Sequence, residues 1–569
     1  MKKIFFLLAL LTHFLGSSQA INLYLVDANT PNSKRVYVTS TTGRLPTPST
    51  RVKYVTTSGG TGAGDIGTPW SLAHAFANAV AGDLIHVAPG NYGSTPLTIS
   101  VSGTASLPIK FMGYNSTAGD IVSFRKSTIE KTVVGGIALN PATMPTLRGT
   151  GNTNTGLTVS GNYVIIENFQ VEDFSSGLLL TGNNNNYVNI VTNECNWNLE
   201  QQGDDSLFEN CLHINARRNA HTILGGENNI TRNSVVWSDY PTDPFDTNPL
   251  TGYHFGATSG ANGNIFEGCT MYRIPDSPSN YHQGHGGLGK HNVFNNTWRN
   301  CVSYNTGIEL NFSDVRDNLF ENWEIYGNYT TNNGQFSSGI RLINGAHHNT
   351  FKNIYIEDTN FPFNFHDFDD GFTPTPDTDL EEGGNNNTFI NIIVNKMWTL
   401  VSNNTIPASA RNATLKVWDN TWINCTFYDQ NGGGGFYNTD MVTQNNRFIN
   451  CVFDNFNSPY PSDLTQDGTA PITYPSSNIS SSNFAIGGTT THAPNFAGPL
   501  TSFNGFQLQS NSLLKNIGQT EVLANTDFFG GARPEGAAYD IGAFEEGATI
   551  APPTSDLIQK RANSIMTDF

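Results

Sequence analysis

The sequence has few charged residues and few long apolar runs. Only 13% of its 569 residues are Asp, Glu, Lys or Arg, against about 25% in an average globular protein. Past the N-terminus no apolar run is long enough to cross a membrane, and residues 150–500 show no helical period. These absences exclude a helical bundle, and we expect no membrane partner.

Basic residues are scarce as well. The chain has 29 Lys and Arg against 47 Asp and Glu, a formal net charge of −18. We expect no nucleic-acid partner, because phosphate binding needs a basic surface. An anionic ligand is still compatible with this charge, since a local cationic groove acts over roughly 8–10 Å at physiological salt.

The first 20 residues have the pattern of an export signal. Lys2 and Lys3 precede an apolar run over 4–11, and Ser18-Gln19-Ala20 forms a small-residue cleavage site. The pattern predicts a secreted or periplasmic protein. The expected segments are a signal peptide (1–20), an N-terminal extension (21–50), the main domain (51–548) and a C-terminal tail (549–569).

One six-residue pattern recurs along the chain: Asn, any residue, an aromatic residue, any residue, Asn, and then Cys or an apolar residue. The shortest intervals between successive copies are 22, 23 and 26 residues. Such a period is typical of a solenoid. Alternating runs of Val, Ile, Phe and Thr, separated by Asn and Gly, predict short strands and turns. We therefore expect coils of strands that stack on one another.

These coils resemble the right-handed parallel β-helix family of secreted polysaccharide lyases and glycoside hydrolases. The segments 54–55, 67–92 and 533–545 are similar to the opening and closing coils of that family. The resemblance implies an all-β fold, a right-handed single-stranded parallel β-helix (solenoid) with a short N-terminal capping helix. That helix would have Pro69 at its first position, behind Thr68.

Equivalent residues of stacked coils lie about 4.8 Å apart, so like residues should form ladders. We expect the second Asn of the motif to form an internal asparagine ladder, the aromatic residues to form a core stack, and the cysteines at one motif position to be free and buried. The expected ladder comprises Asn168, Asn210, Asn300, Asn322, Asn353, Asn391, Asn424 and Asn450. The expected stack comprises Phe208, Phe266, Trp298, Phe320, Phe351, Phe389, Trp422 and Phe448.

A second pattern places a polar residue between apolar neighbours in several coils. Alternate residues of a strand point to opposite sides, so these polar residues should form one solvent-facing column. The column would bring a base, a carboxylate and a guanidinium within roughly 10 Å, which suits a substrate groove; an ordinary polar surface is the alternative. Its members are His254, His282, Glu309, Arg341, Asn364 and Tyr437.

Further polar residues lie close to the column in sequence. His285, Lys290, Asn311 and His366 are candidates for substrate contacts, and a glycine-rich turn with incidental histidines is the alternative for the segment 282–291. No cofactor is required. Oxygen ligands in D-x-D spacing suit Ca²⁺, and a solvated acidic loop is the alternative. These acidic residues are Asp367, Asp369 and Asp370.

The resemblance extends to alginate-lyase-like and chondroitinase-B-like enzymes, which use a Lys base and an Arg one coil later. Lys290 could match that base, while Asn311 lies near the place of the Arg, and Gln283 and His285 stand where that family has acidic calcium ligands. The catalytic motif of that family is therefore not matched.

Two chemistries suit such a column. In β-elimination of an anionic, uronate- or sulfate-bearing polysaccharide, His282 would be the base, with His254, His285 or Lys290 as alternatives, Arg341 would neutralise the carboxylate, and Glu309 would orient the histidine. In hydrolysis of a sulfated or neutral polysaccharide, Glu309 would pair with Asp367 or Asp369. A non-catalytic carbohydrate-binding surface protein is the third alternative. We expect a monomer whose partner is a polysaccharide.

Overall fold

The computed structural model divides the chain into two compact units, Met1–Val52 and Lys53–Phe569. Nearly all of the described residues belong to the second unit. They are 51–119, 143–238, 253–273, 285–311, 314–327, 338–343, 345–366, 384–398, 400–403, 415–430, 436–437, 441–444, 446–456, 483–486 and 494–546.

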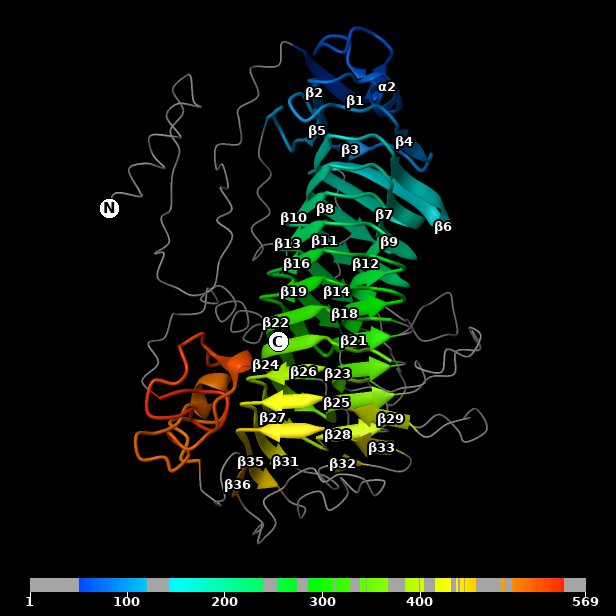
Figure 1. Cartoon of the computed structure of the whole chain (residues 1–569). Coiled ribbons are helices and arrows are strands. Elements are labelled where there is room, and N and C mark those ends of the chain that lie inside the picture. Colours follow the sequence, from blue (N-terminus) through cyan, green and yellow to red (C-terminus); the bar gives the residue numbers. More distant parts are fainter. Residues whose placement is uncertain are drawn as a thin grey trace, which may run out of the picture. The chain divides into compact units, whose positions relative to one another are not determined.

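The described strands stack as coils, and each full coil contributes to three rows of parallel strands (Figure 1). The first row, which carries the repeated motif, contains β10 (Leu207–Glu209), β13 (Ile230–Arg232), β16 (Ile265–Glu267), β19 (Thr297–Arg299), β26 (Thr388–Ile390), β30 (Thr421–Ile423) and β34 (Arg447–Ile449). The second row contains β11 (Leu212–Ile214), β14 (Val235–Ser238), β17 (Thr270–Arg273), β20 (Val302–Tyr304), β27 (Ile393–Met397), β31 (Thr426–Gln430) and β35 (Cys451–Phe456). Long strands that run from one row into the next include β7 (Val164–Leu180), β8 (Asn186–Asn193), β22 (Leu319–Tyr326) and β24 (Thr350–Thr359).

The third row holds the polar column predicted from the sequence. Its strands are β9 (Trp197–Gln201), β12 (Asn219–Leu224), β15 (Tyr253–Thr258), β18 (His285–Lys290), β21 (Gly307–Asn311), β23 (Ser338–Ile343), β25 (Phe361–His366), β28 (Val401–Asn403) and β32 (Phe436–Tyr437). The remaining elements are β1 (Val52–Gly60), α2 (Leu72–Asn78), β2 (Leu84–Val87), β3 (Gly90–Asn91), β4 (Leu97–Ile99), β5 (Ile109–Gly113), β6 (Pro145–Val159), β29 (Leu415–Trp418), β33 (Met441–Gln444), β36 (Asn483–Ile486), and the 3-10 helices η2 (Phe503–Phe506) and η3 (Val522–Ala524).

Left-handed residues turn the chain at the corners of the coils, which explains the abundance of Asn. The second Asn of the motif has a positive φ in every copy, as in Asn300 (φ 55°), Asn322 (φ 54°) and Asn353 (φ 54°). Asn and Gly tolerate this conformation better than other residues. The second motif Asn is therefore conserved along the repeat for its backbone conformation.

The first Asn of the motif builds a buried asparagine ladder that the sequence prediction did not identify. The predicted ladder of second Asn residues is also present, and Asn168, Asn353, Asn391, Asn424 and Asn450 are buried. Asn318 is 1% exposed; its side chain donates to the carbonyls of Val293 (3.0 Å) and Arg316 (2.9 Å) and accepts from the backbone N–H of Asn296 (3.0 Å). The second motif Asn residues also bond to one another, but Asn322 in that series is exposed. The buried ladder contains Asn229, Asn264, Asn296, Asn318, Asn349, Asn387, Asn420 and Asn446.

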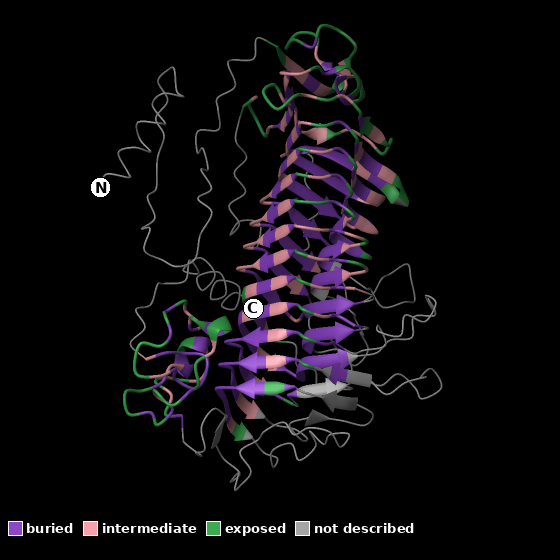
Figure 2. Cartoon of the chain, viewed as in Figure 1, coloured by how far each residue is buried: buried purple, intermediate pink, exposed green. Residues whose placement is uncertain are grey.

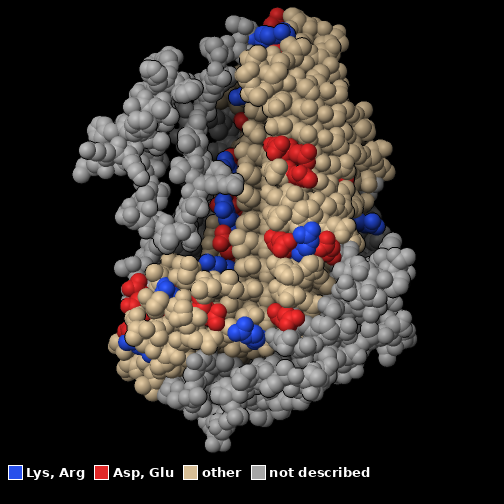
Figure 3. All heavy atoms as spheres, viewed as in Figure 1, with Lys and Arg blue, Asp and Glu red and all other residues tan. Residues whose placement is uncertain are grey.

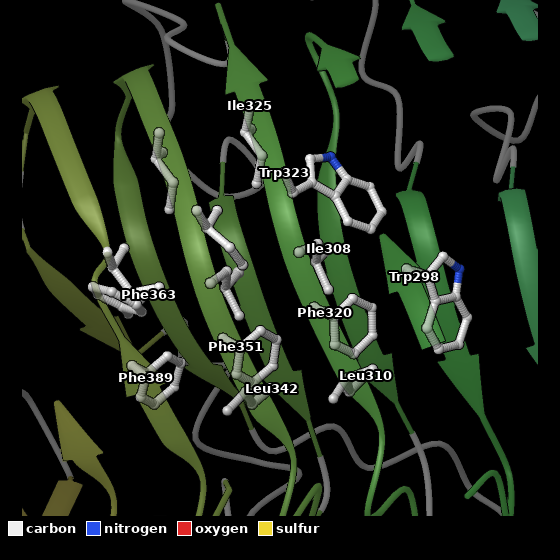
Figure 4. Close-up of a cluster of buried hydrophobic side chains, with 14 of the residues drawn as sticks. Trp298, Ile308, Leu310, Phe320, Trp323, Ile325, Leu342, Phe351, Phe363 and Phe389 are labelled. Carbon is white, nitrogen blue, oxygen red and sulfur yellow. The ribbon is translucent and has the colours of Figure 1, made fainter. Parts of the chain in front are cut away.

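The predicted aromatic stack is confirmed from Phe266 to Phe448, whereas Phe208 stacks on Tyr187 and is separated from Phe266 by His221. Consecutive rings from Phe266 to Phe448 lie 4.6–5.1 Å apart with interplanar angles of 6–14°. Figure 4 shows Trp298, Phe320, Phe351 and Phe389 side by side within the coils. Figure 2 shows that most residues of the strands in these coils are buried. The stack places the largest side chains of the motif in the core.

All six cysteines are free and buried, as predicted. Four of them follow the second motif Asn and Cys269 follows Gly268 in its place, and these five side chains lie in the core with the aromatic stack. Burial raises the pKa of the Cys195 and Cys211 thiols to about 12. The thiols therefore act as small apolar side chains.

The predicted N-terminal helix is present but begins later than expected. It runs over Leu72–Asn78, and Ser71 caps it by accepting a hydrogen bond from the backbone N–H of His74. Pro69 lies outside the helix, so Ser71 rather than Thr68 provides the N-cap. Leu72 and Phe76 pack into the core of the first coils. Within the described residues, no helix is long and apolar enough to span a membrane.

The segment 494–546 packs beside the last coils. Asn391 and Asn450 donate their side-chain N–H groups to the carbonyls of Thr526 (2.9 Å) and Gln519 (2.8 Å). Phe503 lies against Tyr355 at the edge of the second row. The segment therefore covers turns that face outward in the other coils.

Candidate active site

Variation in coil length is concentrated at the two ends of the third row. No more than two residues join a first-row strand to the following second-row strand in any described coil that has both as separate strands. In contrast, the segments next to third-row strands are 239–252, 274–284, 328–337 and 431–435 on the entering side, and 367–383 and 404–414 on the leaving side. Because functional residues gather where a rigid scaffold carries connections of variable length, the third row is the best candidate for a site.

The third row aligns most of the predicted polar column. Glu309 of β21 is in register with Arg341 of β23, which is in register with Asn364 of β25. Asn364 is followed by Ser402 of β28, and Ser402 by Tyr437 of β32. Sequence reasoning missed Ser402 because its coil lacks the turn-apolar-polar pattern. The side chains of Ser402 and Tyr437 lie outside the described part.

The column points away from the core, but it is buried. The neighbouring residues Ile308, Leu310 and Leu342 belong to the apolar core (Figure 4), so period-2 alternation directs the column outward. However, Glu309 is 1% exposed, Arg341 5% and Asn364 1%. The expectation of solvent-facing side chains was therefore wrong, and the charges of the column lie in a shielded environment.

Glu309 is held by donors from two strands. Arg341 donates from Nη1 to Glu309 Oε2 at 3.1 Å, and Asn311 donates from Nδ2 to Glu309 Oε1 at 2.7 Å. Each oxygen of the carboxylate thus has its own donor. An ion pair in a shielded site is stronger than one at the surface, but either partner alone would be costly to bury.

Two amides beside this pair carry polar atoms without hydrogen-bond partners. Among the described residues, Asn364 has no partner for either Nδ2 or Oδ1, and Asn311 has none for Oδ1. Asn311 is 7% exposed. A buried amide atom without a partner costs about 1–3 kcal/mol, so these positions mark a place where a ligand could add hydrogen bonds.

Lys290 and Asn311 lie on a second column, two residues further along the strands. Lys290 of β18 is in register with Asn311 of β21, and Ile343 of β23 with His366 of β25. Lys290 is partly exposed. It stands one strand and two residues from Glu309, roughly 8 Å between Cα atoms at ordinary strand spacings. Of His366, only the backbone is described.

The histidines expected beside Glu309 are not its neighbours in register. Leu288 of β18 stands opposite Glu309, and Gly256 of β15 stands opposite Leu288. His254 lies two residues before Gly256 and is 2% exposed, so it is further from Glu309 than predicted. Among the described side chains, Glu309 pairs with Arg341. The structure describes only the backbone of His285, and His282 lies outside the described residues.

The predicted calcium ligands also fall outside the described residues; they are Asp367, Asp369 and Asp370. Where the structure is described, no group of three or more His, Cys, Asp or Glu side chains could hold a metal ion. Ca²⁺ binding by the acidic segment remains a prediction.

A buried chain of polar groups inside the coils was not found from the sequence. Thr192 Oγ1 lies 2.8 Å from His213 Nδ1, His213 Nε2 lies 3.2 Å from His221 Nδ1, and His221 Nε2 lies 3.1 Å from Thr231 Oγ1. Burial lowers the pKa of His213 to about 3 and that of His221 well below its usual value. Thr231 stands where the other copies of the motif have an aromatic residue, and this substitution was the sequence signal for the chain. The smaller Thr231 leaves a gap between Phe208 and Phe266, which His221 fills.

Charged side chains elsewhere form small groups among uncharged atoms (Figure 3). On the outer side of the first row, Arg232 pairs with Glu209 at 2.9 Å and Arg299 with Glu267 at 3.1 Å. The side chains of Arg299 and Glu267 are 30% and 36% exposed. Exposed pairs of this kind contribute little to stability, so the shielded Glu309–Arg341 pair stands apart from them.

Stacked coils with a polar column on one outer side define a parallel β-helix protein. Residues 53–318 match the family model described as the Pel9A-like right handed beta helix region. The match confirms the expected fold, a right-handed parallel β-helix. No curated protein matches the chain.

Solved structures similar to the chain include polysaccharide lyases and a glycoside hydrolase. Pectate lyase Pel9A is 17% identical, with 87% of this chain and 96% of that chain covered and a TM-score of 0.36. An alginate lyase from Paenibacillus sp. str. FPU-7 is 17% identical, with 69% and 99% covered and a TM-score of 0.34. The catalytic domain of a GH87 alpha-1,3-glucanase is 10% identical, with 67% and 62% covered and a TM-score of 0.35. At these distances, the activity must be argued from the residues of this chain.

Proposed function

We propose that this protein is a secreted carbohydrate-active enzyme that cleaves an anionic polysaccharide along the third row by β-elimination. The observation that carries the proposal is the in-register column Glu309–Arg341–Asn364, in which a shielded ion pair adjoins an amide without partners. The match to a Pel9A-like family model supports a polysaccharide substrate, because Pel9A is a pectate lyase.

The charges of the described third-row strands from β15 to β32 favour an anionic ligand. Lys290 and Arg341 carry two positive charges and Glu309 one negative charge, in a protein whose net charge is −18. Concentration of positive charge in a groove attracts an anionic chain even when the whole protein is acidic.

The same residues favour elimination over hydrolysis. Hydrolysis by the usual mechanism needs two carboxyl groups, about 5–9.5 Å apart. Glu309 is the only Asp or Glu in the described third-row strands from β15 to β32. Elimination instead needs a base and a cation, and this row supplies both.

In the proposed reaction, Lys290 first gives up its own proton to solvent, and its neutral amine then takes the proton on the carbon next to the uronate carboxyl group. The electron pair of that C–H bond forms the double bond of the product, and the bond to the leaving glycosidic oxygen breaks; a proton restores that oxygen as a hydroxyl. Arg341 neutralises the carboxylate, which stabilises the charge that develops on it. Lys290 and Arg341 are two strands and two residues apart, roughly 12 Å between Cα atoms. Their long side chains could therefore reach opposite sides of one sugar ring.

The test is a screen of the purified protein against uronate-bearing, sulfated and neutral polysaccharides. Elimination creates an unsaturated product that absorbs near-ultraviolet light, whereas hydrolysis creates only new reducing ends. We expect both signals to rise together on a uronate polysaccharide. New reducing ends without absorbance would replace elimination by hydrolysis, and the absence of both signals on every substrate would favour a binding protein.

A variant that tests Arg341 must keep the charge of the site balanced. Replacing Arg341 alone removes the counter-charge of the buried Glu309 carboxylate, which typically costs about 3–5 kcal/mol of stability. The double variant Arg341→Gln with Glu309→Gln removes both charges. It should stay folded and lose cleavage.

A further inference from the structure

The Glu309 carboxylate has the surroundings of a bound ligand. Its two oxygens are taken by two different donors, Arg341 Nη1 at 3.1 Å and Asn311 Nδ2 at 2.7 Å. The donors come from adjacent strands, β23 and β21. Together they form a cradle that fits a planar group with two oxygens, since guanidinium and amide donors point along fixed directions.

The residues around the cradle have unused hydrogen-bonding capacity. Asn364 follows Arg341 in register, is 1% exposed, and has no partner for its amide within the described structure. Asn311 keeps an Oδ1 without a partner there. The intramolecular carboxylate therefore satisfies the two donors of the cradle but leaves the neighbouring polar atoms empty.

We propose that Glu309 occupies the binding site of a substrate carboxylate and is displaced when a uronate residue binds. The proposal rests on the proposed function and adds to it that a carboxylate of the protein itself holds the uronate-binding position before substrate binds. The uronate carboxylate takes the donors Arg341 and Asn311, and the hydroxyl groups of the same sugar bond to the amide of Asn364. Binding then fills positions that the resting ion pair leaves empty.

The exchange is compatible with the backbone of the site. Glu309 is joined to its strand by a flexible side chain, so rotation about its side-chain bonds can release the carboxylate while β21 stays in register with β23. Arg341 keeps a negative partner before and after the exchange. The guanidinium is therefore never an isolated buried ion, and the exchange requires that the displaced Glu309 carboxylate moves into solvent.

Displacement has an unusual consequence, because removal of a charged residue should strengthen binding. Glu309→Gln eliminates the competing charge, and the positive charge of Arg341 stays at the site. We expect a uronic-acid trisaccharide to bind Glu309→Gln about tenfold more tightly than the wild type, a change that corresponds to 1.4 kcal/mol. The carboxyl-reduced trisaccharide, which is neutral, should show no such gain.

The matched control is Glu267→Gln on the outer side of the first row. Glu267 also pairs with an arginine, Arg299, at 3.1 Å, but no substrate is expected there. This variant should bind the uronate trisaccharide as the wild type does. The measurement is calorimetric titration of the full chain with three ligands: the uronate trisaccharide, its carboxyl-reduced form, and a sulfated trisaccharide without carboxyl groups.

Thermal unfolding gives a second measurement if Glu309→Gln is destabilised. The uronate trisaccharide should raise the melting temperature of Glu309→Gln more than that of the wild type, because it replaces the missing counter-charge. Equal or weaker uronate binding by Glu309→Gln, with an equal or smaller rise in melting temperature, would overturn the proposal.

The ligands also separate this inference from the proposed function. If the wild type cleaves uronate polysaccharides but Glu309→Gln shows no gain, only the displacement of Glu309 is wrong. If the wild type binds the sulfated trisaccharide and not the uronate, the carboxylate specificity is wrong while an anionic substrate stands. If it binds none of the ligands, both the inference and the proposed function fail.

Discussion

Trp323 fills the space next to Gly287, where no side chain could fit. A Cβ atom on Gly287 would lie 2.5 Å from Cη2 of Trp323. Trp323 stands at the motif position that is Cys in five coils, and its indole N–H donates to Ser303 Oγ at 3.0 Å. The bulky residue in one coil therefore depends on the glycine in another.

We expect Gly287→Ala to destabilise the protein. Overfilling of a packed core typically costs about 1–3 kcal/mol, and thermal or urea unfolding measures the loss. The control is Gly256→Ala, on the outer side of the same row, where a Cβ would meet its nearest neighbour, Leu288, at 3.5 Å. Adding Trp323→Phe to Gly287→Ala should restore part of the stability; a Gly287→Ala variant as stable as Gly256→Ala would contradict this packing.

The two asparagines of the motif should respond differently to substitution. Asn318→Ala removes the two side-chain bonds to Val293 and Arg316 and the acceptor for Asn296, so we expect a loss of about 3 kcal/mol or more. Asn322→Gly keeps the left-handed turn, and we expect a change below about 1 kcal/mol. Unfolding of the two variants side by side tests the assignment of the ladder, which equal losses would refute.

Period and residue class were sufficient to predict the fold, but not the role of each asparagine. The motif shows which residues repeat, yet Asn serves both in a left-handed turn, as Asn322 does, and in a buried ladder, as Asn318 does. Only the position of the turn within the coil separates the two. The aromatic stack and the cysteines were easier to predict, because a large or small apolar side chain has only one favourable location in such a coil.

The sequence predicted the part of the site that depends on a local pattern and missed the part that depends on packing. Glu309, Arg341 and Asn364 share a local pattern, and successive β21, β23 and β25 pair as expected. The position of His282 could not be inferred, because the segment 274–284 lengthens its coil and the register with β18 shifts between His285 and Gly287. The burial of the column and the pairing of Glu309 with Arg341 depend on three-dimensional packing, which no local pattern contains.

Stability should fall in acid because of the two core histidines. Burial lowers the pKa of His213 to about 3, and His221 shifts in the same direction. Below the unfolded value of about 6.5, the unfolded chain binds protons that the folded chain does not, so each histidine removes up to about 1.4 kcal/mol per pH unit as the pH falls.

Urea unfolding between pH 7 and pH 5 measures this effect. His213→Gln should have a shallower pH dependence than the wild type, whatever its stability at pH 7. Phe208→Leu, which lies in the same part of the core, should lose stability but keep the wild-type slope. Identical slopes for His213→Gln and the wild type would show that the histidines are not the acid-sensitive groups.

The cysteines should react only after unfolding. All six are free and buried, and burial raises the pKa of Cys211 to about 12, which suppresses the reactive thiolate at pH 8. Titration with a thiol reagent should find almost no thiols in the native protein and six in the denatured, unreduced protein. A count of none or one after denaturation would mean that disulfides form and that the cysteine column is misassigned.

The choice of Lys290 as the base can be tested against His254. Lys290 lies in register with Asn311, one donor of the Glu309 cradle, whereas His254 is on β15, two strands from Glu309. A positioned general base contributes about 10²- to 10⁴-fold to the rate. We therefore expect Lys290→Met to lower kcat by at least about 100-fold with a modest change in KM, and His254→Asn to retain most of its turnover. Lys352→Met, on the first row beside Glu321, removes the same charge away from the site and should act as the wild type does.

If Lys290→Met turns over normally while His254→Asn is inactive, the base lies at the other end of the row, and the substrate must extend across Leu288 and Gly256 to reach Arg341.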